Sequence, residues 1–291
     1  MGFGRHDEMA KVDIVTTTYR NVDKLKICLT SIVENTKYVD YKWYVWANDP
    51  DDDVKKAIHE SMFVDDILFN DRIEPIFNDT NDGSFSSNNN EAAAEGDSEY
   101  ILFMNDDIEP INDSWLLSMT QILDSDPKVG VVGALLLYPN KTVQHCGVMF
   151  DQRTNGLPFH IFYRQPYTKF MQVNRHYQSV TAACMLVRRE DFEKLNGFNE
   201  QYIYGYEDVD LCLRLKHSLG KNVIYCAGAQ LIHHEGISGK FKQHPHLKNN
   251  MKLFRERWGE KIFNDHQFYL QNPNFMVYKT KQLPVENEDD E

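Results

Sequence analysis

Residues 100–110 constrain the fold of this chain more than any other segment. The first five are apolar or aromatic, and the polar residues Asn105, Asp106 and Asp107 follow without a break. An apolar run of this length is typical of a buried strand. Open α/β sheets bind ligands at the carboxyl ends of their strands, and adjacent carboxylates repel each other unless a cation or hydrogen bonds offset their charge. The segment therefore predicts an α/β sheet with a divalent-metal site that serves a phosphate-bearing ligand.

Strand-like and helix-like segments alternate through the first half of the chain. A helix is indicated after the first strand by the spacing of Leu25, Cys28, Leu29 and Ile32, and Asn21 can supply its cap. Alternation of this kind indicates a mostly parallel sheet with helices on both faces. The strands are expected at residues 11–17, 41–47, 73–77 and 100–104.

The alternation weakens after about residue 130. There is no internal repeat and no linker rich in Pro, Gly or Ser, which favours one compact domain. The elements expected in this half are strands at 131–138, 180–187, 223–227 and 230–233, and helices at 189–196 and 207–219.

Composition narrows the function. The formal net charge of -13 argues against general nucleic-acid binding, which relies on Lys and Arg to neutralise phosphates. The five cysteines form no C-x-x-C pair and fit reduced thiols better than a disulfide framework. The first ten residues lack the apolar core of a signal peptide, and no run of about 18 apolar residues occurs. A cytoplasmic protein is therefore expected.

The triplet at residues 105–107 offers hard oxygen ligands. Mg²⁺ and Mn²⁺ typically bind one or two carboxylates and complete their shell with water and substrate phosphates. Asp and Asn also form turns, so Asp107 or Asp113 could instead cap a helix that contains Trp115. Both interpretations remain open from these residues alone.

Two later segments carry further candidate groups. Glu207 and Asp208 begin a predicted helix, where a carboxylate either complements the helix dipole or serves as a general base. His233 and His234 end a short apolar run, and a neutral imidazole can complete a metal shell. Adjacent residues on a strand point to opposite faces, so at most one of the two histidines faces a given site.

Together these segments resemble the family 2 glycosyltransferases, inverting nucleotide-sugar enzymes of the GT-A fold. The resemblance covers residues 11–258 and is closest to bacterial branches with rhamnosyl, galactosyl or related donors. It implies a Rossmann-like, mostly parallel α/β sheet flanked by helices, with a smaller mixed region on the acceptor side. The segments that carry it are 12–20, 85–90, 105–107, 133–139, 144–147, 207–208 and 233–238.

The resemblance implies one GT-A domain over residues 1–265. Its nucleotide-sugar half extends to about residue 130 and its acceptor half from 131, and residues 266–291 form a C-terminal extension with an acidic tail. The implied donor is a UDP-, dTDP- or GDP-linked sugar. The implied acceptor is a hydroxyl of a glycan, a polysaccharide or a lipid-linked saccharide.

Residue roles follow from the matched motifs. Asp208 is the implied general base with Glu207 beside it, and Asp107 with His233 or His234 is the implied Mn²⁺ or Mg²⁺ site. Asn105 stands where the family has an aspartate, so Asp107 is expected to carry most of the coordination. The residues implied to contact the donor are Thr18, Tyr19, Arg20, Asn48, Asp49, Asn89, Asn105 and Asp106.

Two alternatives remain. Basic residues within 240–261 could cover a diphosphate or dock peripherally on the inner face of an anionic membrane, or they could belong to a solvated helix with Arg255 and Trp258 packing inward. The whole chain could also be a non-catalytic nucleotide-sugar or glycan-binding module with a degenerate site. Asn105 favours that rival, whereas Asp107, Asp208 and a late histidine argue against it.

Overall fold

The computed structural model describes residues 11–64, 67–68, 70–80, 83–151, 154, 156–234, 245–272, 274 and 276–279. No helix in these ranges is both long and apolar enough to cross a lipid bilayer. The elements in chain order are β1 (Val12–Thr18), α1 (Val22–Asn35), β2 (Tyr41–Asn48), α2 (Asp52–Met62), β3 (Phe63–Val64), β4 (Ile67–Leu68), β5 (Ile73–Asn78), α3 (Phe85–Ala93), β6 (Tyr100–Met104), β7 (Ile108–Pro110), α4 (Trp115–Ser125), β8 (Val129–Leu137), β9 (Val143–His145), β10 (Val148–Phe150), β11 (Pro158–His160), η2 (Lys169–Gln172), β12 (Arg175–Tyr177), β13 (Cys184–Arg188), α5 (Arg189–Lys194), α6 (Glu207–Leu219), β14 (Asn222–His233), α7 (Leu247–Trp258) and α8 (His266–Gln271).

A single large sheet runs through the molecule in the order β12-β14-β8-β13-β6-β1-β2-β5. Neighbouring strands from β6 to β5 are all parallel, and β14 is parallel to β8. The strands β13 and β12 run antiparallel to their neighbours. This confirms the predicted parallel sheet and the mixed region in the second half of the chain.

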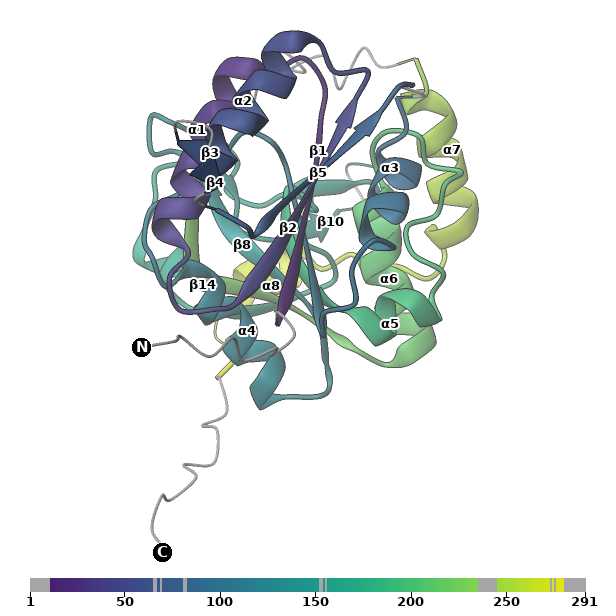
Figure 1. The fold of residues 1–291 in the computed structure, drawn as a ribbon. Coiled ribbons are helices and arrows are strands. Elements are labelled where there is room, and N and C mark those ends of the chain that lie inside the picture. Colours follow the sequence, from purple (N-terminus) through teal and green to yellow (C-terminus); the bar gives the residue numbers. More distant parts are fainter. Residues whose placement is uncertain are drawn as a thin grey trace, which may run out of the picture.

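Helices cover both faces of the sheet (Figure 1). Apolar residues of α1, α2 and α4 pack against one face, and residues of α3, α5 and α6 pack against the other. The helix α7 packs on α6 through Phe254 and Trp258. Strands buried on both faces explain the continuous apolar runs in the sequence.

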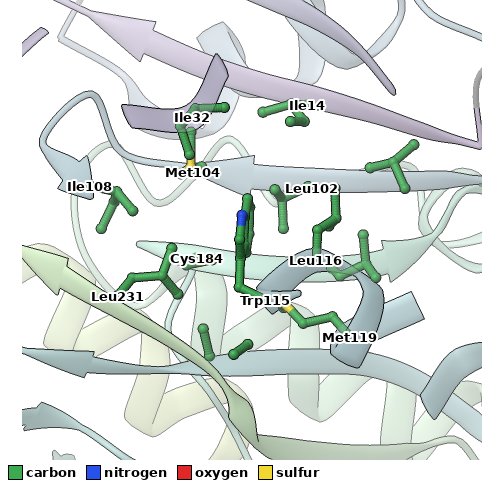
Figure 2. Packing of buried hydrophobic residues seen from close by; sticks show 14 of the residues in the cluster. Ile14, Ile32, Leu102, Met104, Ile108, Trp115, Leu116, Met119, Cys184 and Leu231 are labelled. Carbon is green, nitrogen blue, oxygen red and sulfur yellow. The ribbon is translucent and has the colours of Figure 1, made fainter. Parts of the chain in front are cut away.

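The core directly beneath the polar triplet is tightly built. Figure 2 shows the Trp115 indole of α4 among Leu102, Met104 and Cys184. The indole Nε1 donates to Thr36 Oγ1 at 3.1 Å, so its polar atom is satisfied although the side chain is fully buried. This packing fixes the carboxyl end of β6, from which Asn105, Asp106 and Asp107 project.

Several local expectations need correction. Neither Asp107 nor Asp113 caps a helix. Asp107 leads directly into β7, and the residue at the cap position before α4 is Ser114 rather than Asp113. Asn21 does precede α1, but its side chain makes no capping hydrogen bond. Its Nδ2 instead approaches Asp106 Oδ1 at 3.5 Å.

The two short strands expected at 223–227 and 230–233 are one strand, β14, with a register shift between Cys226 and Gln230. Small residues in the shifted stretch let the backbone bulge without leaving the sheet, and Gln230 Nε2 donates to the Ala227 carbonyl at 3.2 Å. The strand expected at 180–187 starts only at Cys184. The backbone N–H groups of Thr181 and Ala182 donate to side chains, those of His145 and Asp208, instead of to a neighbouring strand.

The basic stretch at 240–261 is helical from Leu247, and its residues 240–244 lie outside the described part. Trp258 packs inward as expected, with Nε1 donating to Asp210 Oδ1 at 2.8 Å. Arg255 is exposed, so its expected inward packing is wrong. Its place is taken by Arg257, whose Nε lies 3.0 Å from Asp210 Oδ1, because residues 254, 257 and 258 share the buried face of α7.

Candidate functional site

The carboxyl ends of four parallel or neighbouring strands form one polar edge. Thr18 ends β1, Asn48 ends β2, Asn78 ends β5, and Asn105 follows β6. In the register of the sheet, Thr18 pairs with Ala47 and Asn48 with Asn78. The side chains expected to contact a nucleotide therefore share the edge where open α/β sheets bind their ligands.

Thr18 connects this edge to the acidic triplet. Its Oγ1 donates to Asp106 Oδ2 at 2.6 Å, and Asn21 Nδ2 lies 3.5 Å from the other oxygen. Loss of hydration in this half-buried position raises the pKa of Asp106 to about 6, and the neighbouring Asp107 adds to the rise while the Thr18 hydrogen bond opposes it. Asp106 is thus turned toward the loop after β1.

Tyr19, Arg20 and Asp49 form the outer rim of the same edge. Arg20 Nη2 lies 2.8 Å from Asp49 Oδ2, and the Arg20 guanidinium stacks 5.0 Å from the centroid of the Tyr19 ring. Arg20 and Asp49 both have positive φ, at 53° and 40°. A non-glycine residue in this region is uncommon, and here two such residues are joined by an exposed ion pair at the rim.

Asn48 and Asn89 differ in their surroundings. Asn48 Oδ1 accepts from Trp46 Nε1 at 3.0 Å and from Asn78 Nδ2 at 3.2 Å, which orients the Asn48 amide at the end of β2. Asn89 is buried within α3, and its Nδ2 donates to the Phe85 carbonyl one turn earlier. The Asn89 amide therefore serves its own helix in this structure.

Asp107 and His233 meet across the sheet edge. The strands β7 and β14 pair antiparallel with Ile108 opposite His233, which brings Asp107 Oδ1 to 2.9 Å from His233 Nε2. Asn105 Nδ2 lies 3.2 Å from the same Nε2. His234 is directed elsewhere, because its Nε2 contacts Glu109 Oε2 at 2.8 Å. Of the two adjacent histidines, only His233 faces Asp107.

The Asp107 and His233 pair fits a divalent cation by its chemistry. A carboxylate oxygen and an imidazole nitrogen both suit Mn²⁺, and neighbouring ligands of an octahedral ion with bonds of about 2.1 Å lie about 3 Å apart. The observed 2.9 Å is the distance of an ordinary hydrogen bond and is also compatible with that spacing. Within the described ranges, no group of three His, Cys, Asp or Glu residues could hold a metal, so two protein ligands would leave the rest of the shell to water and phosphate.

Glu207 and Asp208 begin α6 after a sharply turned loop. Gly205 and Tyr206 both have positive φ, at 91° and 76°. Asn250 of α7 holds this loop by donating Nδ2 to the carbonyls of Tyr204 and Gly205 at 2.9 and 3.1 Å. The loop therefore delivers the two carboxylates at a helix N-terminus, where negative charge is stabilised.

The two carboxylates have different environments. Asp208 is half-buried, and its Oδ2 accepts from the Ala182 backbone amide at 3.1 Å. Glu207 is 7% exposed and its Oε2 has no hydrogen-bond partner in the described part of the chain. Burial, with the neighbouring charge of Asp208 as a further cause, raises the pKa of Glu207 to about 8. Burial therefore favours the protonated form of the Glu207 carboxyl.

Residues 181–183 connect the acidic triplet to Asp208. The backbone N–H of Asn105 donates to the Ala183 carbonyl at 3.1 Å, while the backbone N–H of Ala182 donates to Asp208 Oδ2. The Thr181 amide donates to Nε2 of the fully buried His145 at 3.3 Å. Burial lowers the pKa of His145 to about 3, so this ring stays neutral.

Three groups of the site carried no role in the sequence prediction. Gln144 accepts from His233 Nδ1, His145 supports residue 181, and Asn250 holds the loop before Glu207. Gln144 and His145 do lie in a motif that resembles the family, but the motif alone does not say what they contact. Gly236 and Ser238, which belong to the same resemblance, lie outside the described residues.

Comparison with known proteins bears on these observations. The model of a family described as glycosyl transferase family 2 matches residues 13–195, and a model described as the N-terminal domain of galactosyltransferase matches residues 164–236. The O-antigen biosynthesis protein RfbC of Myxococcus xanthus is 34% identical over 234 residues, which are 78% of this chain and 18% of RfbC. The chain spans only 29% and 18% of the lengths of two curated relatives that it matches.

Solved structures share the fold. The mannosyltransferase PcManGT of Pyrobaculum calidifontis, in complex with GDP-Man and Mn²⁺, superposes with a TM-score of 0.58 at 14% identity, over 80% of this chain and 59% of that one. GalNAc-T7 with UDP, GalNAc and Mn²⁺ gives 0.67 at 13% identity, over 91% and 51%. These likenesses confirm the predicted GT-A fold. By its matched motifs, its fold and the family model that covers most of its length, the chain belongs to glycosyl transferase family 2.

Proposed function

We propose that the protein is a metal-dependent, inverting glycosyltransferase that moves a sugar from a nucleoside-diphosphate sugar to a hydroxyl acceptor. The observation that carries the proposal is the short backbone segment 181–183, which is hydrogen-bonded to both Asn105 and Asp208. Through it, a candidate base and a candidate metal-binding triplet are fixed relative to one another.

Asp208 has the properties of a general base. Its carboxylate is half-buried at the start of α6, where the helix dipole stabilises negative charge, and the backbone amides of Ala182 and Val209 donate to its two oxygens. Asp208 would accept the proton of the acceptor hydroxyl as that oxygen forms its bond to the anomeric carbon and the bond to the diphosphate breaks on the opposite side. Such a base contributes roughly 10²–10⁴-fold to the rate.

The leaving diphosphate carries the developing negative charge. Asp107 and His233 would hold a Mn²⁺ or Mg²⁺ ion, which supplies charge stabilisation to the departing diphosphate. Thr18, Asn48 and the rim formed by Tyr19, Arg20 and Asp49 would contact the nucleoside of a UDP-, dTDP- or GDP-linked sugar. The acceptor would be a saccharide or another hydroxyl compound, and lipid-linked saccharides at a membrane surface belong to this class.

A panel of nucleotide sugars with and without Mn²⁺ tests the proposal in two steps. Thermal shift selects the donor that stabilises the protein most, because a ligand that binds only the native state raises apparent stability. Release of the nucleoside diphosphate from that donor then measures turnover. We expect turnover only with a divalent ion, and we expect Asp107→Ala to lose the Mn²⁺-dependent part of the thermal shift.

Asp208→Asn separates base catalysis from folding. We expect it to lower turnover by about 10²–10⁴-fold with nearly unchanged nucleotide affinity by calorimetry. The matched control is Asp52→Asn, which changes an exposed aspartate in the first turn of α2. Equal loss of turnover and nucleotide affinity in Asp208→Asn would make Asp208 structural. Full turnover in that variant would reject it as the base.

A further inference from the structure

Gln144 is an internal polar side chain that the proposed chemistry does not use. It lies on β9, is 5% exposed, and its Oε1 is hydrogen-bonded to Nδ1 of His233, which is 89 residues away along the chain. Burying an amide is costly unless its hydrogen bonds are made. The question is what its contact with His233 does to the imidazole.

The Gln144 amide determines which nitrogen of His233 faces Asp107. Gln144 presents an oxygen to Nδ1, so Nδ1 is the donor of this contact. Nε2 then points to the other side of the ring, where it lies 2.9 Å from Asp107 Oδ1 and 3.2 Å from Asn105 Nδ2. Nε2 is therefore the nitrogen that a divalent cation shared with the Asp107 carboxylate would bind.

The backbone around Gln144 is held on both sides. Its carbonyl accepts from His160 Nδ1 at 2.9 Å, and the next residue, His145, bonds the Ala134 carbonyl of β8 through its own Nδ1 at 3.0 Å. The strand β9 also pairs with β8 through Leu136 opposite His145. The Gln144 amide is therefore presented to His233 from a rigid support, which is the arrangement that fixes a ligand ring before the metal arrives.

We propose that Gln144 is a positioning residue that fixes His233 in the tautomer and orientation needed to bind a divalent cation through Nε2. The proposal rests on the proposed metal role of His233.

The first test measures which ring nitrogen of His233 carries a proton. Nitrogen-15 NMR of the metal-free protein, with His233 assigned through a His233→Asn variant, distinguishes a protonated from an unprotonated Nδ1. We expect wild type and Gln144→Glu, which keeps an acceptor oxygen, to show a protonated Nδ1. Gln144→Leu removes the acceptor and should give a mixture of tautomers. Thr142→Val, just before β9 and with its hydroxyl directed to Asn140, should match wild type.

The second test measures Mn²⁺ affinity, from the electron paramagnetic resonance signal of the free ion, with the nucleoside diphosphate that stabilises wild type most. We expect about 10–100-fold weaker binding in Gln144→Leu and near-wild-type binding in Gln144→Glu and Thr142→Val. Thermal unfolding of each metal-free variant controls for misfolding.

The outcomes are distinguishable. A wild-type tautomer in a folded Gln144→Leu protein, or unchanged Mn²⁺ affinity, would overturn the positioning role. Absence of Mn²⁺ binding in wild type would refute the metal-dependent function instead, and the NMR comparison would still decide whether Gln144 fixes the ring.

Discussion

Replacing Glu207 with glutamine should change how the stability of the protein depends on pH. Glu207 is buried at the start of α6 with its Oε2 lacking a hydrogen-bond partner among the described residues. Burial raises its pKa from 4.5 to about 8. In the unfolded chain the same carboxyl is hydrated and ionises near its ordinary value, so between these two pH values only the folded state keeps the proton.

The direction in which pH changes the free energy of unfolding follows from proton linkage. Where the folded state binds more protons than the unfolded state, the free energy of unfolding falls as pH rises, by about 1.4 kcal/mol per unit for one group. At a pH well below the ordinary pKa of 4.5, Glu207 is protonated in both states and does not change the free energy of unfolding. Between about pH 5 and pH 7 the wild type should lose about 2.5 kcal/mol, whereas Glu207→Gln carries an amide that does not titrate and loses none of it.

Thermal unfolding from pH 5 to pH 8 measures this difference. At about 2 °C per kcal/mol for a chain of this size, the melting temperature of Glu207→Gln should rise relative to wild type by about 5 °C between pH 5 and pH 7. Glu91→Gln, at an exposed position of α3, controls for the loss of one surface charge. Parallel pH profiles for wild type and Glu207→Gln would refute the reasoning, because they would mean that Glu207 is ionised in the folded protein.

Two further changes test the scaffold. Arg189→Ala removes the guanidinium that lies 2.7 Å from the buried carboxylate of Asp13. Because the Asp13 charge then stays buried without its ion-pair partner, the free energy of unfolding should fall by about 3 kcal/mol. The control variant Arg255→Ala, at an exposed position, should change it little. Chemical denaturation measures both, and equal effects would contradict the role of the ion pair. Gly133→Ala would bring a Cβ to 2.5 Å from Val180 Cβ, so a loss of about 1–3 kcal/mol is expected. Adding Val180→Ala should recover part of that loss, and simple additivity would argue against a direct clash.

The order and type of most elements could be predicted from the sequence because they follow from local patterns. The strand β6 and the helix α6 have the predicted bounds, and Gly220 ends α6 in the left-handed conformation. Apolar runs predict buried strands and helical spacing predicts the buried face of α1, since both depend on periods of a few residues. Motif order along the chain was enough to predict the family.

Tertiary structure decided which atoms meet. His233 rather than His234 faces Asp107 because β14 pairs with β7 in a register that no local pattern encodes. Asp106 is turned to Thr18 because β1 and β6 are neighbours in the sheet, and Arg257 reaches Asp210 because α7 packs on α6. Sequence by itself determined the supply of carboxylates, amides and imidazoles at the sheet edge. Only the folded chain, through contacts such as Gln144 to His233 across 89 residues, fixed their orientation, because the direction of a side chain at a strand end depends on distant neighbours.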